Sequence, residues 1–480
     1  MLRGLNLINE ILEMKTALSK VLDKEKLMYC FDCGICTASC PISAIMGKDY
    51  NPRNLLERIV SDPTNALNSD ELWLCAWCYR CHDHCPQALK LPEIFLLMRK
   101  IAAGRGQTQS FDSALHKIVE TIPLPLVALS VCFHPERAGL DKQATLEKVE
   151  TIREGTSRGR RLRTIPGNSP IAVIGSGPAG LTVADQLNAK GCDVTVFESL
   201  PEPGGMLRKC IPENRLAKQV LAKEIQYLKD SGIKFKTDVT VGRDLNFGDL
   251  KNQGFKAVFI GVGAHKSARL RIQGTDLGGV VQALDFLKDV NFGVRTEIGK
   301  EVFVIGGGNV AMDAAKTALQ LGAAAVTVLY RRSRDEMPAI PWEVEEAEYK
   351  GVRIEFLVSP KQIIGEEGKV CSIECSRMQL GETDETGRRS PTPIESSEFT
   401  RKADMVIVAV GETPDLGFLS NGEVNADGTL WVNPVTNETS IKGVFAAGDV
   451  VTGPGTVMEA IRAGKDAARS IETYLMSQGG

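Results

Sequence analysis

The sequence lacks an apolar stretch long enough to cross a lipid bilayer. A membrane-spanning helix needs about 20 consecutive apolar residues, and the stretch at residues 123–133 is too short to be one. The apolar core of a secretory signal is lacking too, because residues 1–27 show the pattern of an amphipathic, charged helix. We therefore expect neither a membrane span nor a secretory signal.

An excess of charge of one sign is also lacking. Lys and Arg total 57 and Asp and Glu total 60, which gives a formal net charge of −3 and a pI of about 6.1. This balance provides no whole-chain attraction to nucleic acid or to anionic lipid. The charged fraction of 24% and the apolar fraction of 43% are ordinary for a globular protein. The chain is long enough for about two to four domains.

Cysteine, by contrast, is abundant. Thirteen cysteines in such a chain indicate metal ligation in a reducing compartment, for which we predict the cytoplasm, rather than a disulfide scaffold. Eight of them stand in two identical C-x2-C-x2-C-x3-C-P phrases, which start at Cys30 and Cys75 and end at Pro41 and Pro86. This spacing is typical of proteins with two 4Fe-4S clusters, in which the fourth cysteine of each phrase binds the cluster of the other phrase.

That exchange defines two predicted ligand sets. Paired zinc sites are the alternative, but zinc more often uses two separate C-x2-C pairs and needs neither the triple spacing nor the proline. Helical patterns surround both phrases; one follows Pro52, with Leu55, Leu56 and Ile59 on a single face. The predicted sets are Cys30, Cys33, Cys36 and Cys85 for one cluster, and Cys75, Cys78, Cys81 and Cys40 for the other.

A connector follows this helical region. It is rich in arginine toward its end, which favours a solvated linker; docking to an acidic partner or to a cofactor phosphate is the alternative. Its arginines are Arg153, Arg158, Arg160, Arg161 and Arg163.

Two segments then repeat the order strand, glycine-rich turn, helix, strand. They cover residues 170–198 and 300–332, with turns at 175–180 and 306–311. In such a unit the first glycine makes a tight turn, the second lets the backbone approach a pyrophosphate, and the third small residue packs helix on strand. The helix N-terminus adds a positive dipole end. The expected nucleotide-binding residues are Gly175, Gly177, Pro178, Ala179 and Gly180, and Gly306, Gly308, Asn309, Val310 and Ala311.

The two units differ at the end of their second strand. In the first unit the predicted strand 193–197 ends in Glu198, a carboxylate that suits the free ribose hydroxyls of FAD or NAD. In the second unit Tyr330, Arg331 and Arg332 occupy this place, and two guanidinium groups suit the 2′-phosphate of NADPH. A pair of surface arginines without a ligand is the alternative for Arg331 and Arg332.

From residue 170 onward the chain resembles the small subunit of NADPH-dependent glutamate synthase and related NADPH-binding subunits of electron-bifurcating transhydrogenases. The resembling motifs are GSGPAGL at 175–181, PGGML at 203–207, IPENRL at 211–216, DLGGVVQALDFL at 276–287, GGGNVAMD at 306–313, YRRSRDEMPA at 330–339, VAVGETPD at 408–415 and VFAAGDVVTGPGTVMEAI at 444–461.

The resemblance implies an α/β fold with two nested Rossmann-like dinucleotide-binding domains, preceded by a mainly α-helical ferredoxin domain. The implied FAD-binding domain is interrupted by the NADPH-binding domain and resumes after it. The expected division is 1–135 for the double-cluster ferredoxin domain, 136–165 for the linker, 166–295 and 402–480 for the FAD-binding domain, and 296–401 for the NADPH-binding domain.

The resemblance also implies further cofactor-binding residues. Gly204 and Gly205 should lie against the flavin or the pyrophosphate, and Asp449 should bond the ribityl chain. Thr456 and Val457 should open a final helix whose N-terminus faces the flavin, where its dipole stabilises negative charge. The same motifs add Met206, Arg215, Asp313, Gly411 and Gly448.

The N-terminal module departs from glutamate synthase small subunits and looks more like the iron–sulfur C subunit of heterodisulfide reductases. His82 and His84 flank its last cysteines and either donate hydrogen bonds toward a cluster or are solvated. A cluster-ligand role is the alternative for Cys132, and a redox role is the alternative for Cys210, which is expected to be a small buried thiol near the flavin. A redox-active C-x2-C is lacking from the NADPH-binding domain, where residues 371–375 read C-x3-C in a strand-like segment. Disulfide reduction is therefore disfavoured.

The predicted function is electron transfer by an NADPH-dependent FAD and iron–sulfur oxidoreductase subunit. A hydride would pass between NADPH and FAD, and single electrons between FAD and two clusters, with no catalytic side chain required. We expect other redox subunits as partners in a hetero-oligomer, such as flavin or iron–sulfur proteins and ferredoxin- or NAD-reducing subunits. An electron-bifurcating transhydrogenase or hydrogenase-type complex is the expected setting. The alternatives are the small subunit of glutamate synthase and an assembly subunit that has lost a cofactor.

Overall fold

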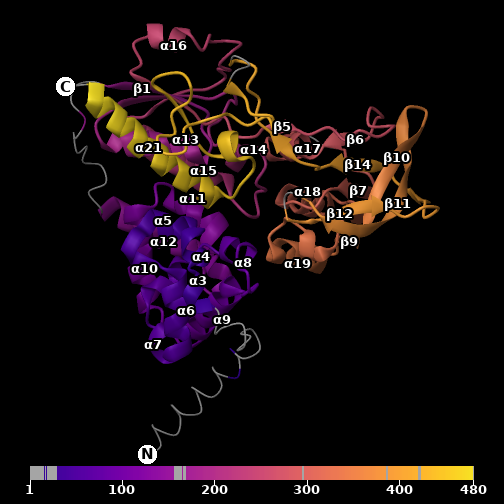
Figure 1. Cartoon of the computed structure of the whole chain (residues 1–480), viewed down its shortest axis with the longest axis horizontal. Helices are drawn as coiled ribbons and strands as arrows, with labels where there is room; N and C mark the ends of the chain where they lie inside the picture. The colour runs from indigo at the N-terminus through magenta and orange to yellow at the C-terminus, as the bar shows by residue number, and fades with distance from the viewer. Residues whose placement is uncertain are drawn as a thin grey trace, which may run out of the picture. The chain divides into compact units, whose positions relative to one another are not determined.

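The computed structural model describes residues 16, 18, 30–155, 165, 169–294, 297–384, 387–419 and 423–478. The chain divides into two compact units (Figure 1). Unit 1 comprises Met1–Gly204, Lys218–Val262 and Leu416–Gly480, and unit 2 comprises Gly205–Ala217 and Gly263–Asp415. The amphipathic helix expected within residues 1–27 falls outside the described residues, except for Thr16 and Leu18.

Unit 1 begins with a helical module that carries both cysteine phrases. Its helices are α3 (Cys30–Cys33), α4 (Ile35–Ala38), α5 (Pro41–Met46), α6 (Pro52–Ser61), α7 (Pro63–Ala66), α8 (Arg80–Asp83), α9 (Leu91–Gly104), α10 (Gln109–Thr121), α11 (Pro125–Ala128) and α12 (Lys142–Gly155). Shorter turns of 3₁₀ or π helix cover Gly47–Asp49, Asp70–Leu74, Leu129–Phe133 and Pro135–Ala138.

Helix α6 forms as its sequence predicts. Asn51 caps the helix by accepting hydrogen bonds from the backbone N–H groups of Arg53 and Asn54, and proline stands at the first helical position. Leu55, Leu56 and Ile59 are fully buried on one face. The cap and the apolar face together fix α6 between the two phrases.

Helix α12 differs from the solvated linker that the arginine-rich connector suggests. Leu146 and Val149 are buried, and Arg153 is buried in an ion pair with Glu224 at 2.5 Å. Glu224 lies on α15 (Lys218–Asp230) and also accepts from the backbone of α11. The number of arginines alone could not indicate this role, because the buried partner of Arg153, Glu224, is distant in sequence.

The rest of unit 1 is a five-stranded parallel sheet in the order β16-β4-β1-β2-β3. Helix α13 (Pro178–Ala189) joins β1 to its parallel neighbour β2, as the repeated strand–turn–helix–strand order predicts. Helices α13 and α21 (Val457–Gln478) lie side by side on this sheet (Figure 1). The strands are β1 (Pro170–Ile174), β2 (Asp193–Phe197), β3 (Lys234–Lys236), β4 (Ala257–Ile260) and β16 (Val444–Ala446), with the short helices α16 (Asp249–Asn252) and α20 (Asp449–Thr452) beside them.

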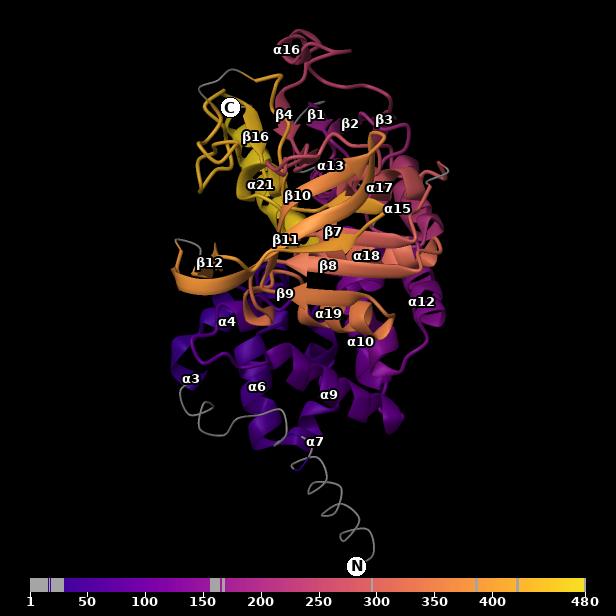
Figure 2. The same cartoon turned by 90° about the vertical axis from the view of Figure 1, so that its right-hand side faces the viewer.

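Unit 2 contains a second five-stranded parallel sheet, in the order β6-β14-β7-β8-β9. Strands β7, β8 and β9 run alongside one another in Figure 2. Its strands are β6 (Val280–Gln282), β7 (Glu301–Ile305), β8 (Ala325–Tyr330), β9 (Arg353–Phe356) and β14 (Met405–Val408), and its helices are α14 (Met206–Lys209), α17 (Ala283–Asn291), α18 (Asn309–Gln320) and α19 (Pro341–Tyr349).

An antiparallel sheet adjoins it within the same unit. It pairs β10 with β11, and β11 with both β12 and β13. The bounds are β10 (Val358–Glu366), β11 (Lys369–Thr383), β12 (Arg389–Pro393) and β13 (Phe399–Lys402), and a separate ladder pairs β5 (Lys266–Ser267) with β15 (Glu412–Thr413).

The two parallel sheets confirm the predicted α/β class with nested Rossmann-like folds, because unit 2 interrupts the chain of unit 1. The borders of the units differ from those of the predicted domains, because residues 205–217, 263–295 and 402–415, which the prediction assigns to the FAD-binding domain, belong to unit 2. Which segments bind each nucleotide stays a prediction. Within the part of the chain that the structure describes, no helix has the length and apolar character needed to cross a membrane.

Candidate functional site

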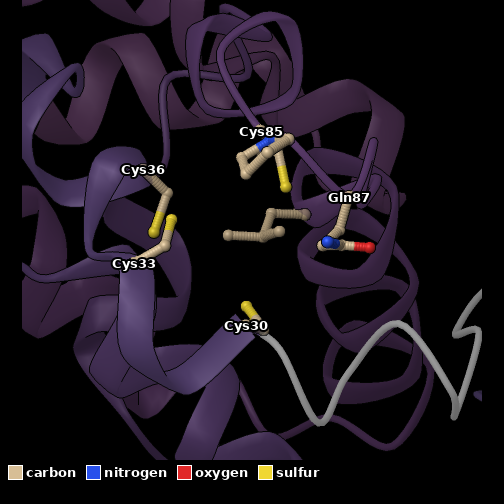
Figure 3. Close-up of a pocket in the computed structure, with 7 residues that line it drawn as sticks. Cys30, Cys33, Cys36, Cys85 and Gln87 are labelled. Carbon is tan, nitrogen blue, oxygen red and sulfur yellow. The ribbon is translucent and has the colours of Figure 1, made fainter.

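The first cysteine set surrounds a single cavity. Cys30, Cys33, Cys36 and Cys85 line it, and Figure 3 shows their sulfur atoms directed into the same space. Cys85 comes from the second phrase and the other three come from α3 and α4. Leu91, Pro86 and Gln87 complete the lining. The structure thus brings together the four residues that the crossed-ligand pattern groups.

The second set is close enough together for its thiolates to repel one another. Burial and, to a smaller extent, the Cys75 thiolate raise the pKa of Cys40 to about 12. Burial raises the pKa of Cys78 and Cys81 strongly, and the thiolates of Cys40 and Cys75 raise both pKa values as well. Cys40 therefore sits with the second phrase, although it belongs to the first.

These thiols suit a cationic iron–sulfur core. Burial and the thiolates of Cys36, Cys85 and Cys33 raise the pKa of Cys30 to about 11, so four negative sulfurs need positive charge among them. Among the described side chains, no three His, Cys, Asp or Glu stand as they would around a single metal ion. The first set instead encloses a cavity, as a multi-iron cluster requires.

Backbone N–H groups point at several of these sulfurs. The amides of Ile35 and Leu89 donate to Cys33 and Cys85 at 3.5 Å, and those of Ser43 and Trp77 donate to Cys40 at 3.5 Å and Cys75 at 3.4 Å. Such hydrogen bonds favour thiolate ligands and raise the reduction potential of a bound cluster.

The two phrases also share a backbone turn. Gly34 and Tyr79 each follow the second cysteine of their phrase, and both adopt left-handed conformations, with φ 64° and 62°. Each caps a one-turn helix that carries the third cysteine. Tyr79 accepts this costly conformation with its ring buried and its hydroxyl bonded to Glu93. The repeat is therefore one of structure as well as of spacing.

The flanking residues form local contacts. His82 and His84 place Nδ1 against the backbone carbonyls of Leu89 at 3.2 Å and Arg80 at 2.9 Å. Their role toward a cluster stays a prediction. Cys132 is buried in the π-helical turn Leu129–Phe133.

The first glycine turn has the shape of a phosphate cradle. Gly175 has φ 95°, and a Cβ there would stand 2.5 Å from the Gly261 carbonyl oxygen. A Cβ on Gly180 would stand 2.0 Å from the Gly175 carbonyl oxygen, so helix and strand meet closely. Beside Gly177 nothing lies within 4 Å, which leaves space at the N-terminus of α13. Pro178 and Ala179 form the first helical turn.

Glu198 is tied to this turn through a residue that the sequence reasoning missed. Its buried carboxylate accepts from the Ser176 backbone at 2.9 Å and from the Ser176 hydroxyl, and also from the Leu200 backbone at 2.9 Å. The Ser176 hydroxyl in turn accepts from the Gly204 backbone at 2.8 Å. Ser176 thus connects the glycine turn, the acidic strand end and the Pro-Gly-Gly segment.

Helix α21 starts at Val457, as expected, and is capped from within. Glu459 accepts from the Thr456 backbone and hydroxyl, each at 2.8 Å, and its other oxygen pairs with Arg80 of the second cysteine phrase. Gly448 has φ 83° and precedes Asp449, which opens α20. The helical module and the α21 N-terminus are therefore joined inside unit 1.

The second glycine turn repeats these features in unit 2. Gly306 has φ 144°, and a Cβ on it would stand 2.1 Å from the Ala409 carbonyl oxygen. The space beside Gly308 is open within 4 Å. Asn309 opens α18 and accepts from the Ile340 backbone at 2.9 Å. Val310 and Ala311 pack α18 on the sheet core, and Gly411 has φ 128° and accepts from the Ala268 backbone at 2.8 Å.

The two arginines at the end of β8 have different surroundings. Arg331 is exposed. Arg332 is buried; it pairs with Asp384 at 2.7 Å and donates to the Arg389 carbonyl at 2.8 Å. Arg388 also lies near, because its charge joins those of Arg331 and Arg332 in lowering the pKa of Tyr330, which burial raises. No sequence pattern indicates Asp384 or Arg388, which belong to the β11–β12 hairpin.

Arg215 and Asp313 are brought together, but in a buried ion-pair network. Arg215 contacts Asp313 at 2.6 Å and Glu343 at 3.0 Å, and Lys316 contacts Glu343 and Glu346. The network attaches residues 205–217 to α18 and α19. Met206 packs against the core of unit 2, and Gly205 has φ 53°.

The remaining cysteines show no redox pairing. Cys210 is buried in the core of unit 2, as a small thiol would be, and Cys375 is buried on β11. All thirteen cysteines are free of disulfides. Cys371 lies on the same strand, which confirms the strand-like segment.

Two dinucleotide-type glycine turns and two crossed cysteine sets define a nucleotide-dependent oxidoreductase with an iron–sulfur module. The family model described as "Pyridine nucleotide-disulphide oxidoreductase" matches residues 169–464, and that of the "4Fe-4S dicluster domain" matches residues 26–89. The chain belongs to the pyridine nucleotide-disulphide oxidoreductase family.

Individual proteins agree with this assignment. The chain is 44% identical over 325 residues to the NADP(+)-dependent formate dehydrogenase subunit beta of Moorella thermoacetica, covering 67% of this chain and 46% of that protein. It is 39% identical over 318 residues to a putative glutamate synthase [NADPH] small chain of Cereibacter sphaeroides, covering 64% and 76%. The second match confirms the resemblance to glutamate synthase small subunits.

A solved structure shows the same fold. Mycobacterium tuberculosis FprA in complex with NADPH has a TM-score of 0.56 and 21% identity, covering 65% of this chain and 86% of that one. The chain spans about half the length of the formate dehydrogenase subunit that it matches.

Proposed function

We propose that this chain is the NADPH-dependent electron-transfer subunit of a larger redox complex. FAD would occupy the first glycine turn, NADPH the second, and one 4Fe-4S cluster each cysteine set. The observation that carries the proposal is the presence, in one chain, of two open glycine turns and two crossed sets of four cysteines. When bound, these groups supply hydride exchange between NADPH and FAD and single-electron transfer through the clusters.

The protein's own residues bind and orient these groups. Ser176 and Glu198 hold the first turn in shape. The N-termini of α13 and α21 would present their positive dipole ends to the phosphate and the flavin. Asp449 would bond the ribityl chain. In the second unit Asn309 fixes the turn and Arg331 would contact the 2′-phosphate. Arg332, already paired with Asp384, would hold the neighbouring hairpin in place.

The two cysteine sets adjoin at Cys36. The Cys36 thiolate contributes to the raised pKa of Cys40 and of Cys81, although burial is the larger cause in both. Two clusters bound in these sets would therefore be neighbours, as stepwise electron transfer requires. Cys33 is exposed, so the first set offers an exit toward a partner.

The partner would be another redox subunit, flavin- or iron–sulfur-containing. A bifurcating transhydrogenase or hydrogenase-type complex is the setting expected from the sequence, and the likeness to a formate dehydrogenase subunit adds formate oxidation as a source of electrons. The small subunit of glutamate synthase is the second candidate, which the 39% identity to such a chain favours. We place the complex in the cytoplasm, because thirteen free thiols suit a reducing compartment.

Exchanging ligands tests the cluster assignment directly. Cys33→Ala and Cys85→Ala should abolish the same electron paramagnetic resonance (EPR) signal, although they lie in different phrases. Cys40→Ala and Cys78→Ala should abolish the other signal, and Cys132→Ala should abolish neither. The unaltered protein should contain about eight irons and one FAD. If Cys33→Ala and Cys40→Ala, which lie in the same phrase, abolish the same signal, the crossed sets are wrong.

A further inference from the structure

Arg99 places a positive charge deep inside the helical module. Its side chain lies on α9 and the residue is only 4% exposed. The guanidinium donates to three backbone carbonyls: to Leu72 at 2.8 Å, to Cys75 at 2.6 Å and to Phe133 at 3.3 Å. All three of its nitrogens therefore have hydrogen bonds, but carbonyl groups carry no net charge that would balance it.

Arg99 has no carboxylate partner within the described part of the chain. Three other buried cations have one: Arg153 pairs with Glu224, Lys316 with Glu343, and Arg332 with Asp384. Burial lowers the pKa of Arg99, and the groups that raise it again are Cys75 and Tyr50. Burial raises the pKa of Tyr50 well above its usual value and keeps it neutral, which leaves Cys75, whose backbone carbonyl accepts from the guanidinium, as the negative group beside Arg99.

A buried cation without an anionic partner is costly, and the Trp73 ring, whose centroid lies 5.9 Å from the guanidinium carbon, carries no net charge either. The cost is removed if an anion occupies the neighbouring space. A 4Fe-4S core with four thiolates carries a net negative charge, and the Arg99 guanidinium is bonded to the backbone of one predicted ligand. We propose that Arg99 is the internal counter-ion of the cluster bound by Cys75, Cys78, Cys81 and Cys40, and that it raises the reduction potential of this cluster.

This inference rests on the proposed function, because it requires a cluster in the second set. Reduction adds one negative charge to the cluster, and a fixed cation in a site of low dielectric favours the more negative state. The first set has a different neighbour: the Arg53 guanidinium lies near Cys30 and is only half-buried. Water screens a charge at such a place, so Arg53 should act on its cluster more weakly.

The test is an EPR-monitored redox titration of the cluster-containing protein with dithionite and mediators. Arg99→Gln removes the charge and keeps hydrogen-bond donors, whereas Arg99→Lys keeps the charge and alters the hydrogen bonds. Arg53→Gln is the matched control. We expect Arg99→Gln to lower the ratio of reduced to oxidised second cluster at least tenfold at a fixed potential, which is 59 mV for a one-electron couple. Arg99→Lys should restore most of it.

Each outcome has one meaning. A shift in Arg99→Gln, confined to the signal that Cys40→Ala abolishes and largely restored in Arg99→Lys, supports the counter-ion role. Equal shifts in the Gln and Lys variants would overturn it, since hydrogen bonding and not charge would then set the potential. An unchanged second signal in Arg99→Gln would also overturn it. If the unaltered protein shows only one cluster, the proposed function fails first and the inference falls with it.

Discussion

Gly464 is where helices α13 and α21 meet in unit 1. A Cβ on Gly464 would stand 2.6 Å from the Ala179 carbonyl oxygen and 2.8 Å from the Thr182 Cβ. Both atoms are fixed by the backbone of α13, so they cannot move aside as the end of a flexible side chain would. Gly464→Ala should therefore push the two helices apart and displace the N-termini that we assign to FAD.

The magnitude results from two opposing effects. Alanine in a helix interior gains about 1 kcal/mol over glycine. Overpacking of a close contact costs about 1–3 kcal/mol, and the rigid neighbours of Gly464 favour the upper part of that range. We expect the free energy of unfolding to fall by about 1–2 kcal/mol, which is roughly a 5- to 30-fold change in the folding equilibrium constant. FAD should dissociate more readily by a similar factor.

The assay is the dissociation constant for FAD, from recovery of flavin fluorescence on dilution, beside the urea midpoint of unfolding. Gly104→Ala is the matched control: Gly104 also lies in a helix and is exposed, with nothing within 4 Å of its would-be Cβ. The control should keep FAD and gain slightly in stability. If Gly464→Ala behaves like Gly104→Ala, the close helix contact does not position the FAD site.

Three further predictions concern unit 2. Arg215→Met should lower the stability of this unit by about 3 kcal/mol, because it leaves the buried carboxylates of Asp313 and Glu343 short of a cation; the exposed Arg243→Met should leave the urea midpoint unchanged. His265, whose pKa burial and the Lys209 ammonium lower to about 4, should make unfolding pH-dependent. The unfolded chain binds the proton more readily, so the stabilising contribution is full above about pH 6.5 and falls toward pH 4. Urea titrations at pH 7.5 and 5.0 should show that the free energy of unfolding falls by about 2 kcal/mol, and His265→Asn should abolish this loss. An unchanged loss in the variant would assign it to other groups. Arg331→Glu should raise the KM for NADPH far more than that for NADH, whereas equal effects in steady-state assays would remove the 2′-phosphate assignment.

Much of the fold could be predicted because its signals are local. The glycine turns at Gly175 and Gly306, with a strand before and a helix after, specify the two parallel sheets. The cysteine spacing likewise grouped Cys85 with Cys30, and the structure places both at one cavity. Each of these patterns lies within a few residues along the chain.

The rest depends on partners that are distant in sequence. Gly464 looked like any helical glycine until α13 was placed against it. Arg332 appeared free for a phosphate, but Asp384 of a hairpin pairs with it. The role of Arg99 arises from its burial beside Cys75, which no spacing rule indicates. Ion pairs and close packing of this kind are decided by the three-dimensional arrangement and leave no periodic pattern.

The most direct test of whether NADPH electrons enter through this chain is an anaerobic titration of the isolated protein with NADPH and, separately, with NADH. Flavin absorbance near 450 nm and the broad cluster absorbance would be followed together. NADPH should bleach the flavin at lower concentration than NADH, and cluster reduction should follow. A bound flavin that neither nucleotide reduces would contradict the assignment of this chain as the point at which NADPH electrons enter.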